Sequence, residues 1–340
     1  MQINVPQMAE SVVRGERRGV AKAITLLEST RPDHRVLADE LLTALLPHTG
    51  KAFRLGLSGV PGVGKSTFIE SLGLYLIGQG LKVAVLAIDP SSSLSGGSIL
   101  GDKTRMERLS TEINAYIRPS PSSCNLGGVA EKTREAMLVC EAAGYDVVII
   151  ETVGVGQSET AVANMTDMFV VLQLPNAGDD LQAIKKGVME MADLVVINKA
   201  DIDPAAATRA QAQITSSLRL FAMHGNPEHG AHDASQKAQW QPKVLQISAL
   251  QGSGVDNFWN TVQEYRQINA DNGHIGQRRQ DQSLAWMWER IDAGLKQAFR
   301  QHDGVRDRLP QFTEQVRDGK IAASTAARQL LQAFQGQAGL

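Results

Sequence analysis

Short apolar runs alternate with helical stretches through the middle of the chain. Because nearly every residue of a run is apolar, rather than every second residue, the runs are typical of strands that are covered on both faces. Such strands separated by helices predict a mainly parallel, doubly wound sheet in an α/β domain. The runs cover residues 53–58, 82–89, 146–151, 168–174, 193–198 and 243–248.

Both ends of the chain have a helical pattern instead. Leucine recurs every four residues between 37 and 45, and apolar residues recur at spacings of three and four between 284 and 299. The second pattern predicts a helix with one apolar face, which we expect to pack either within the subunit or against a second copy in a homodimer. The predicted parts are a helical extension over residues 1–50, the α/β domain over 51–268 and a helical dimerisation arm over 269–340.

Composition excludes several classes of protein. The chain has 340 residues, of which 34 are basic and 36 acidic, so its formal net charge is −2 and argues against a strongly basic nucleic-acid-binding protein. Two cysteines are too few for a disulfide scaffold or a four-cysteine zinc site. No apolar run reaches the ~18 residues of a membrane span. We expect a cytoplasmic protein that binds neither nucleic acid nor membrane.

A glycine-rich turn follows the first apolar run and precedes a helical stretch. Its sequence, GVPGVGKS, is a complete Walker A pattern, or P-loop. The glycines let backbone N–H groups point at phosphate oxygens, while Lys65 brings a positive charge to the outer phosphates and the Ser66 hydroxyl can bind Mg²⁺. The residues expected to bind the nucleotide phosphates are Gly59, Val60, Pro61, Gly62, Val63, Gly64, Lys65, Ser66 and Thr67.

Carboxylates at the ends of two apolar runs are candidate ligands for that Mg²⁺. Asp89 ends the run over 82–89, and Glu151 ends the run over 146–151. Since a P-loop precedes them in the same predicted sheet, we expect at least one of the two to serve the metal. Asp102 lies in a glycine-rich loop that can fold over the same ion.

The sequence NKAD, at the end of another apolar run, indicates which base the bound nucleotide carries. An aspartate at this place, Asp201, can accept hydrogen bonds from both the ring N–H and the exocyclic amine of guanine, a pair that adenine does not offer. Asn198 and Lys199 begin the same motif, and the last apolar run ends in a second loop that suits the guanine carbonyl. That loop consists of Ser248, Ala249 and Leu250.

Two segments between these motifs are suited to sensing the outer phosphate. The first, residues 151–159, joins Glu151 to two glycines that can act as hinges. The second, residues 175–182, opens a helix. The residues expected to respond to the nucleotide state are Gly154, Gly156, Gly178, Asp179, Asp180, Gln182 and Lys185.

The motifs together characterise a family. They are GVPGVGKST (59–67), AIDPSS (87–92), GGSILGDKTRM (96–106), RPSPSS (118–123), ETVGVGQSE (151–159), GDDLQAIKKG (178–187) and NKAD (198–201). The chain resembles, over nearly its whole length, the MeaB/ArgK family of GTPases, which are chaperones of adenosylcobalamin-dependent acyl-CoA mutases such as methylmalonyl-CoA mutase.

The resemblance implies a P-loop fold of the signal-recognition and MinD-like (SIMIBI) class, flanked by a helical extension and a dimerisation arm. It implies that segment 151–159 is a switch and that segment 178–187 relays the nucleotide state to the mutase. It also implies a set of residues around Mg²⁺, namely Ser66, Asp89, Asp102 and Glu151.

We therefore expect a homodimeric GTPase that binds GTP and GDP with Mg²⁺. The nucleotide state would gate the loading of adenosylcobalamin and protect or reactivate the mutase. In hydrolysis, Lys65, Mg²⁺ and Arg105 would offset the charge that develops on the γ-phosphate. The residue that positions the attacking water stays open among Asp89, Gln157 and Glu159.

Two alternatives remain at the level of sequence. One is a GTPase that delivers a metal ion, because His224, His229 and His232 gather in one polar stretch, although no cysteine or carboxylate joins them at ligand spacing. The other is a nucleotide-dependent protein kinase linked to amino-acid transport. The NKAD motif argues against adenine as the base of such a kinase.

Overall fold

A computed structural model describes most of the chain and divides it into two compact units. The first unit is Met1–Gly276 and the second is Gln277–Leu340. The described residues are 3–88, 106–119, 126–152, 158–176, 186–224 and 239–336.

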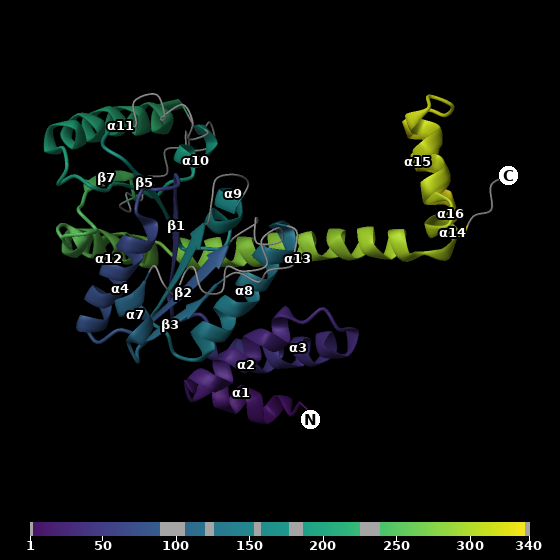
Figure 1. The fold of residues 1–340 in the computed structure, drawn as a ribbon, viewed down its shortest axis with the longest axis horizontal. Helices are drawn as coiled ribbons and strands as arrows, with labels where there is room; N and C mark the ends of the chain where they lie inside the picture. The colour runs from purple at the N-terminus through teal and green to yellow at the C-terminus, as the bar shows by residue number, and fades with distance from the viewer. Residues whose placement is uncertain are drawn as a thin grey trace. The chain divides into compact units, whose positions relative to one another are not determined.

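A sheet of seven strands, all parallel, lies at the centre of the first unit in the part of the chain that the structure describes (Figure 1). Its order is β3-β2-β4-β1-β5-β6-β7, so the first strand of the chain lies in the middle of the sheet. This arrangement confirms the predicted doubly wound α/β fold. The strands are β1 (Phe53–Gly59), β2 (Val83–Ile88), β3 (Ala115–Arg118), β4 (Val147–Thr152), β5 (Met168–Gln173), β6 (Leu194–Ile197) and β7 (Lys243–Gln246).

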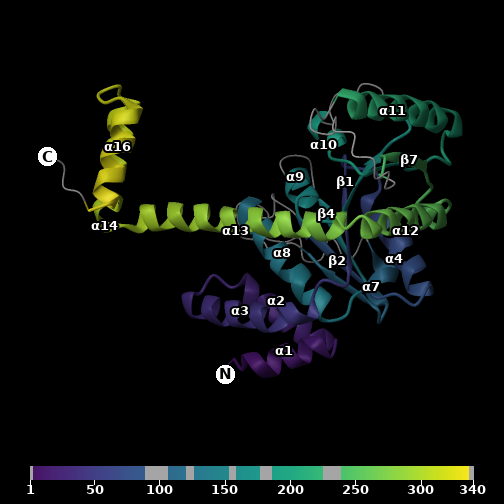
Figure 2. The ribbon, with the colours of Figure 1, turned by 180° about the vertical axis from the view of Figure 1, so that it is seen from behind.

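Helices cover both faces of this sheet (Figures 1 and 2). The strands alternate their side chains between two buried clusters: Leu55 and Leu57 of β1 pack on one face, and Val148 and Ile150 of β4 pack on the other. The first face is covered by α4 (Lys65–Gly78), α7 (Glu107–Thr111) and α12 (Val255–Asp271). The second face is covered by α8 (Leu126–Ala142), α9 (Ser158–Ala163), α10 (Lys186–Glu190) and α11 (Pro204–His224).

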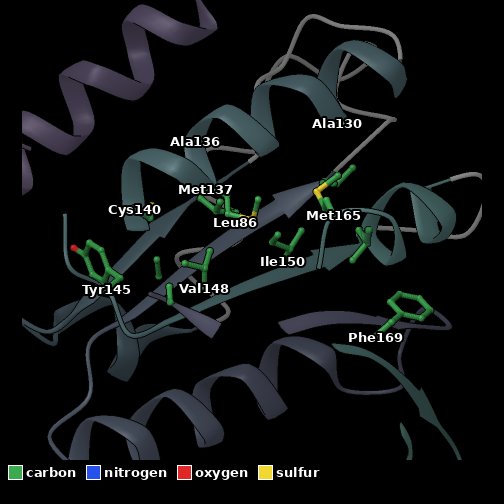
Figure 3. Close-up of a cluster of buried hydrophobic side chains, with 14 of the residues drawn as sticks. Leu86, Ala130, Ala136, Met137, Cys140, Tyr145, Val148, Ile150, Met165 and Phe169 are labelled. Atoms are coloured by element: carbon green, nitrogen blue, oxygen red, sulfur yellow. The ribbon is translucent and has the colours of Figure 1, made fainter. Parts of the chain in front are cut away.

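The N-terminal helices belong to the second of these clusters. They are α1 (Val5–Val13), α2 (Arg17–Glu28) and α3 (Pro32–Leu45), followed by the short 3-10 helix η1 (Leu46–His48). Asn4 caps α1 by accepting a hydrogen bond from the Gln7 N–H, and the fully buried Val20 and Ile24 of α2 share a hydrophobic cluster with Met137 of α8. Figure 3 shows part of this cluster between α8 and the sheet. The extension thus adds a further helical layer over α8.

Three aspartates at the starts of strands fix neighbouring strands to one another. The carboxylate of Asp146, before β4, accepts the backbone N–H of Lys82 at 2.8 Å. Asp167, before β5, accepts that of Arg54, and Asp193, before β6, accepts that of Phe169, each also at 2.8 Å. At each of these junctions a side chain therefore supplies one more bond between adjacent strands.

The second unit is a small helical structure with a thin core. Phe299 and Phe334 pack edge to face with their ring centroids 5.5 Å apart, and the buried residues Val305, Ala326 and Leu330 lie nearby in sequence. The helices are α13 (His274–Gln301), which begins in the first unit, α14 (Asp303–Arg306), α15 (Leu309–Arg317) and α16 (Ala323–Phe334).

Helix α13 is described over its whole length and buries none of its residues. Large apolar side chains on it remain exposed at the predicted helical spacing. They are Leu284, Met287, Trp288, Ile291 and Leu295. None of the described helices combines the length and the apolarity that crossing a bilayer would require.

Candidate functional site

The P-loop joins the central strand β1 to the first turn of α4. Gly64 caps this helix with φ of +94°, a left-handed conformation that favours glycine. A Cβ atom at this position would lie 2.6 Å from the side-chain nitrogen of Asn198. Glycine is therefore required at position 64 for two reasons: its left-handed backbone conformation and the close approach of the Asn198 side chain.

The start of α4 is suited to binding an anion. Among the described residues, no side chain caps α4 by a hydrogen bond at its N-terminus. The N–H groups of its first turn point into the P-loop and remain able to bind an anion. Lys65 is the first residue of α4, and its Nζ donates to the backbone oxygens of Gly59 at 2.6 Å and Val60 at 3.4 Å. The lysine ammonium thus lies over the P-loop backbone, where the outer phosphates of a nucleotide are expected.

Two side chains of the NKAD motif are hydrogen-bonded to the P-loop. Asn198, which is 1% exposed, donates from Nδ2 to the Val63 carbonyl at 2.8 Å. Lys199 donates from Nζ to the Gly62 carbonyl at 2.9 Å. Lys199 also has a positive φ of 62°, which is uncommon for a residue with a side chain and is typical of functional sites. The NKAD motif and the P-loop are therefore connected directly.

The loop after β7 completes this network. The Ala249 N–H donates to Oδ1 of Asn198 at 3.0 Å, and the Ala200 N–H donates to the Ile247 carbonyl at 3.0 Å. Ser248 and Ala249 are buried, whereas the Leu250 side chain is 84% exposed and Asp201 is exposed as well. The structure thus brings together the phosphate loop, the NKAD motif and the loop over 248–250.

Glu151 lies beside this network, at the end of β4. The strand pairs with β1 so that Glu151 is opposite Leu57, and the neighbouring Thr152 donates a hydrogen bond to Ser58 at 3.1 Å. Val147 and Ile149 pack on the α4 face of the sheet, so by strand alternation Glu151 lies on that face too. It is 2% exposed.

Two described side chains near this end of the sheet carry oxygens of the kinds that bind Mg²⁺, namely the Ser66 hydroxyl at the start of α4 and the Glu151 carboxylate in β4. Hydroxyl and carboxylate oxygens are ligands that Mg²⁺ prefers, so this pair fits the metal. No group of three or more His, Cys, Asp or Glu in the described ranges is placed to hold a metal ion by itself.

Several predicted site residues lie outside the described residues. Glu159, in contrast, lies in a described range, where it is buried at the second position of α9. The predicted residues beyond the described ranges are Asp89, Asp102, Arg105, Gly154, Gly156, Gln157, Gly178, Asp179, Asp180, Gln182, Lys185, His229 and His232.

Sequence reasoning missed two features of the site. Gln251 donates from Nε2 to Oδ2 of Asp201 at 3.4 Å. Its position directly after Leu250 was the one available signal. Glu70 of α4 accepts the backbone N–H groups of Arg108 and Leu109 at the start of α7, a contact between distant segments that no local pattern indicates.

Comparisons with known proteins agree with these motifs. The chain matches, over residues 20–303, the family model described as methylmalonyl-CoA mutase-associated GTPase MeaB. It is 46% identical over 344 residues to the mitochondrial methylmalonic aciduria type A homolog of Mus musculus, covering 98% of this chain and 80% of that protein. It is 44% identical over 339 residues to GTPase ArgK of Escherichia coli, covering 98% of this chain and 99% of that protein.

A solved structure shares the fold as well. The crystal structure titled LAO/AO transport system kinase superposes with a TM-score of 0.74 at 37% identity, covering 98% of this chain and 100% of that one.

Proposed function

This chain belongs to the MeaB family of GTPases, as its motifs predict, and from that premise we propose that its nucleotide state controls the loading of adenosylcobalamin into an acyl-CoA mutase. The family is named for its association with methylmalonyl-CoA mutase, which makes a mutase of that type the proposed partner. Binding would also protect the mutase from inactivation or reactivate it.

One observation carries the proposal at the site. Asn198 and Lys199 donate hydrogen bonds to P-loop carbonyls, so the loop proposed to read the base is bonded to the loop proposed to hold the phosphates. The nucleotide proposed for this site is GTP or GDP, with Asp201 accepting from the guanine N–H groups and with residues 248–250 near the guanine carbonyl.

At the phosphate end we assign roles to the remaining residues. Lys65 would exchange its carbonyl partners for phosphate oxygens, and Ser66 and Glu151 would hold Mg²⁺, which neutralises charge on the phosphates when it is bound. From outside the described residues, Asp89, Asp102, Arg105 and Gln157 would complete the metal and catalytic groups.

Replacing Asp201 with Asn tests the assignment of the base. The amide presents a donor to guanine where the carboxylate presents an acceptor, so GTP binding should weaken by roughly 3–5 kcal/mol. The variant should prefer xanthosine triphosphate, whose base offers a carbonyl in place of the amine. Binding constants for the two nucleotides decide the matter, and a variant that still prefers GTP would remove Asp201 from base recognition.

The sheet order supports a relay from nucleotide to partner. The neighbours of β1 are β4 and β5, so the chain segments that leave these two strands begin beside the P-loop. The segment after β4 contains Gly154 and Gly156, and the segment after β5 leads to residues 178–185 before α10 begins at Lys186. We propose that a contact with the γ-phosphate in either segment changes how the partner binds.

The test compares GTP hydrolysis with and without methylmalonyl-CoA mutase. We expect Gln182→Ala and Lys185→Ala to keep the intrinsic rate and to lose its acceleration by the mutase, because a ligand alters a partner only through differential affinity. Matched controls are Gln79→Ala and Lys82→Ala. Both side chains are exposed and lie just before β2 begins, at the end of the parallel strands opposite the P-loop. Full acceleration in both relay variants would contradict the assignment.

The arm carries the proposal of a homodimer. Helix α13 exposes five large apolar side chains along one stripe, and a surface of this kind is usually covered by a partner. We propose that the same stripe of a second copy covers it, because a symmetric dimer needs only one self-complementary patch.

A further inference from the structure

One side chain in the base-reading region has no role in the function described so far. Gln251 lies at the tip of the loop after β7, and its Nε2 donates to Oδ2 of Asp201 at 3.4 Å, longer than most N–H···O hydrogen bonds. Fifty residues separate the two in sequence. Among the described residues, Gln251 is the side chain that donates a hydrogen bond to the Asp201 carboxylate.

The loop around Gln251 holds residue 251 in a fixed place. The Gln251 N–H donates to Oγ of Ser248 at 3.3 Å, and Ser248 forms an antiparallel bridge with Ser253. Gly254 closes the turn with φ of +79°, and a Cβ atom there would lie 2.8 Å from the Gln246 carbonyl. The backbone that carries Gln251 is therefore a tight, internally bonded turn.

Asp201 has the opposite character. Its side chain is exposed, whereas the Asn198 of the same motif is bonded at both ends of its amide. An exposed aspartate samples several rotamers, and reading two N–H groups of one base requires a single orientation. A neighbour that selects this orientation in advance would reduce the cost of binding.

The carboxylate has room for such a neighbour. Two oxygens offer about four acceptor positions. Guanine uses two of them, one for the ring N–H and one for the exocyclic amine, so a third donor can stay in place when the base binds. The side-chain amide of Gln251 can thus remain on Asp201 in the complex.

We propose that Gln251 is a positioning residue for base recognition, which orients the Asp201 carboxylate toward guanine. The inference rests on the proposed function of Asp201. Gln251 acts through the aspartate, so its contribution should depend on how many hydrogen bonds the base makes to that carboxylate.

The test uses GDP and inosine diphosphate, which differ only in the exocyclic amine and are not hydrolysed. Gln251→Ala should raise the Kd for GDP about three- to tenfold, the range of one ordinary hydrogen bond. The Kd for inosine diphosphate should rise less, because that base makes one bond to Asp201 instead of two. A purely structural role of Gln251 in the loop would weaken both nucleotides by the same factor.

Two further variants make the comparison decisive. Gln251→Glu places a second carboxylate beside Asp201 and should weaken GDP more than Gln251→Ala does. Gln267→Ala is the matched control, because Gln267 donates to the exposed Asp271 at 2.8 Å on α12 and should leave both Kd values unchanged. Melting curves of each variant show that it is folded.

Equal losses for GDP and inosine diphosphate, or a Gln251→Glu variant that binds GDP like the unmodified chain, would overturn the inference. Failure of the underlying function is a separate result. If Asp201→Asn shows no gain for xanthosine diphosphate over GDP, the base assignment fails and the inference fails with it. If that gain is present while the Gln251 losses are equal, the inference alone fails.

Discussion

An aspartate precedes three of the apolar runs in the sequence, as DVVII, DMFVV and DLVVI. In the structure each of these carboxylates accepts a backbone N–H at the start of the adjacent strand. The beginning of a parallel strand has N–H groups that the backbone ladder does not yet pair, and a buried one is costly to leave unbonded. At the residue scale, these aspartates help to set which strands lie side by side.

The aspartates at 167 and 146 give a matched pair for testing this. Both accept at 2.8 Å, but Asp167 is fully buried and Asp146 is exposed. Asp167→Ala leaves the Arg54 N–H without its partner inside the protein and should cost about 1–3 kcal/mol of unfolding free energy. Asp146→Ala exposes the Lys82 N–H to water and should cost much less. Urea unfolding of the two variants measures the difference, and equal losses would contradict the role of burial.

Tyr145 makes the stability depend on alkaline pH. Burial, with a smaller contribution from Cys140, raises the pKa of its phenol to about 12, against about 10 in an unfolded chain. Below pH 10 both states are protonated. Between pH 10 and pH 12 only the unfolded state ionises, so it binds fewer protons and the unfolding free energy falls. Figure 3 shows the two side chains near the end of α8 and the start of β4.

Tyr145→Phe removes this ionisation while it keeps the ring. The unfolding free energy of the variant should therefore fall less between pH 10 and pH 12 than that of the unmodified chain. Denaturant unfolding at several pH values measures both slopes. Parallel slopes would show that Tyr145 ionises at the same pH in the folded and the unfolded chain.

At the scale of elements, α8 is held to the sheet by a buried ion pair. Arg54 of β1 donates from Nε to Glu141 at 2.6 Å and from its NH2 group at 3.2 Å, and the Gly50 N–H donates to the same carboxylate at 2.7 Å. Both side chains are nearly excluded from solvent. One carboxylate therefore ties α8, β1 and the end of the N-terminal extension together.

Glu141→Ala should be among the most destabilising single changes in the first unit. It leaves the Arg54 charge buried without its partner, which typically costs about 3–5 kcal/mol. Glu264→Ala is the control, since Glu264 pairs with Lys243 at 2.6 Å with both side chains nearly half exposed, and such a pair contributes about 0–1 kcal/mol. Similar losses in thermal or urea unfolding would mean that Arg54 reaches water when its partner is removed.

Most of the strands could be predicted from the sequence, because β1, β2 and β4 to β7 each coincide with one of the mainly apolar runs. The strand β3 was missed. It covers only Ala115–Arg118 at the edge of the sheet, and the Arg118 side chain pairs with Glu28 of α2. A partner distant in sequence stabilises this edge, and a local pattern carries no sign of it.

The site divides in the same way. The P-loop and the NKAD motif could be placed at the ends of strands because each follows an apolar run directly. The hydrogen bond from Asn198 to Val63 could not be predicted. It depends on the order of the strands, in which β5 lies between β1 and β6, and the sequence does not state that order. Gln251 was missed for a related reason, since its contact with Asp201 arises where two loops from different strands meet.

At the scale of the whole molecule, the boundary between the two units predicts where the chain can be cut. The C-terminal helix of the first unit, α12, is part of its core: the rings of Phe68 and Phe258 pack edge to face at 4.9 Å, and Trp259 is buried in the same cluster. A cut after Gly276 keeps this helix whole. A chain of residues 1–276 should therefore fold and bind GDP as the full chain does, because every described contact of the nucleotide loops lies within it.

The same cut removes the apolar stripe of α13, so the shortened chain should sediment as a monomer and the full chain as a dimer. A finer test changes one residue. Trp288 is 60% exposed within the stripe, and Trp288→Glu places a charge where the second copy would pack, which should give a monomer with unchanged GDP binding. Ala293→Glu, exposed on the opposite side of the same helix, should stay dimeric. A full chain that sediments as a monomer, or a Trp288→Glu variant that stays dimeric, would show that this stripe does not join two copies.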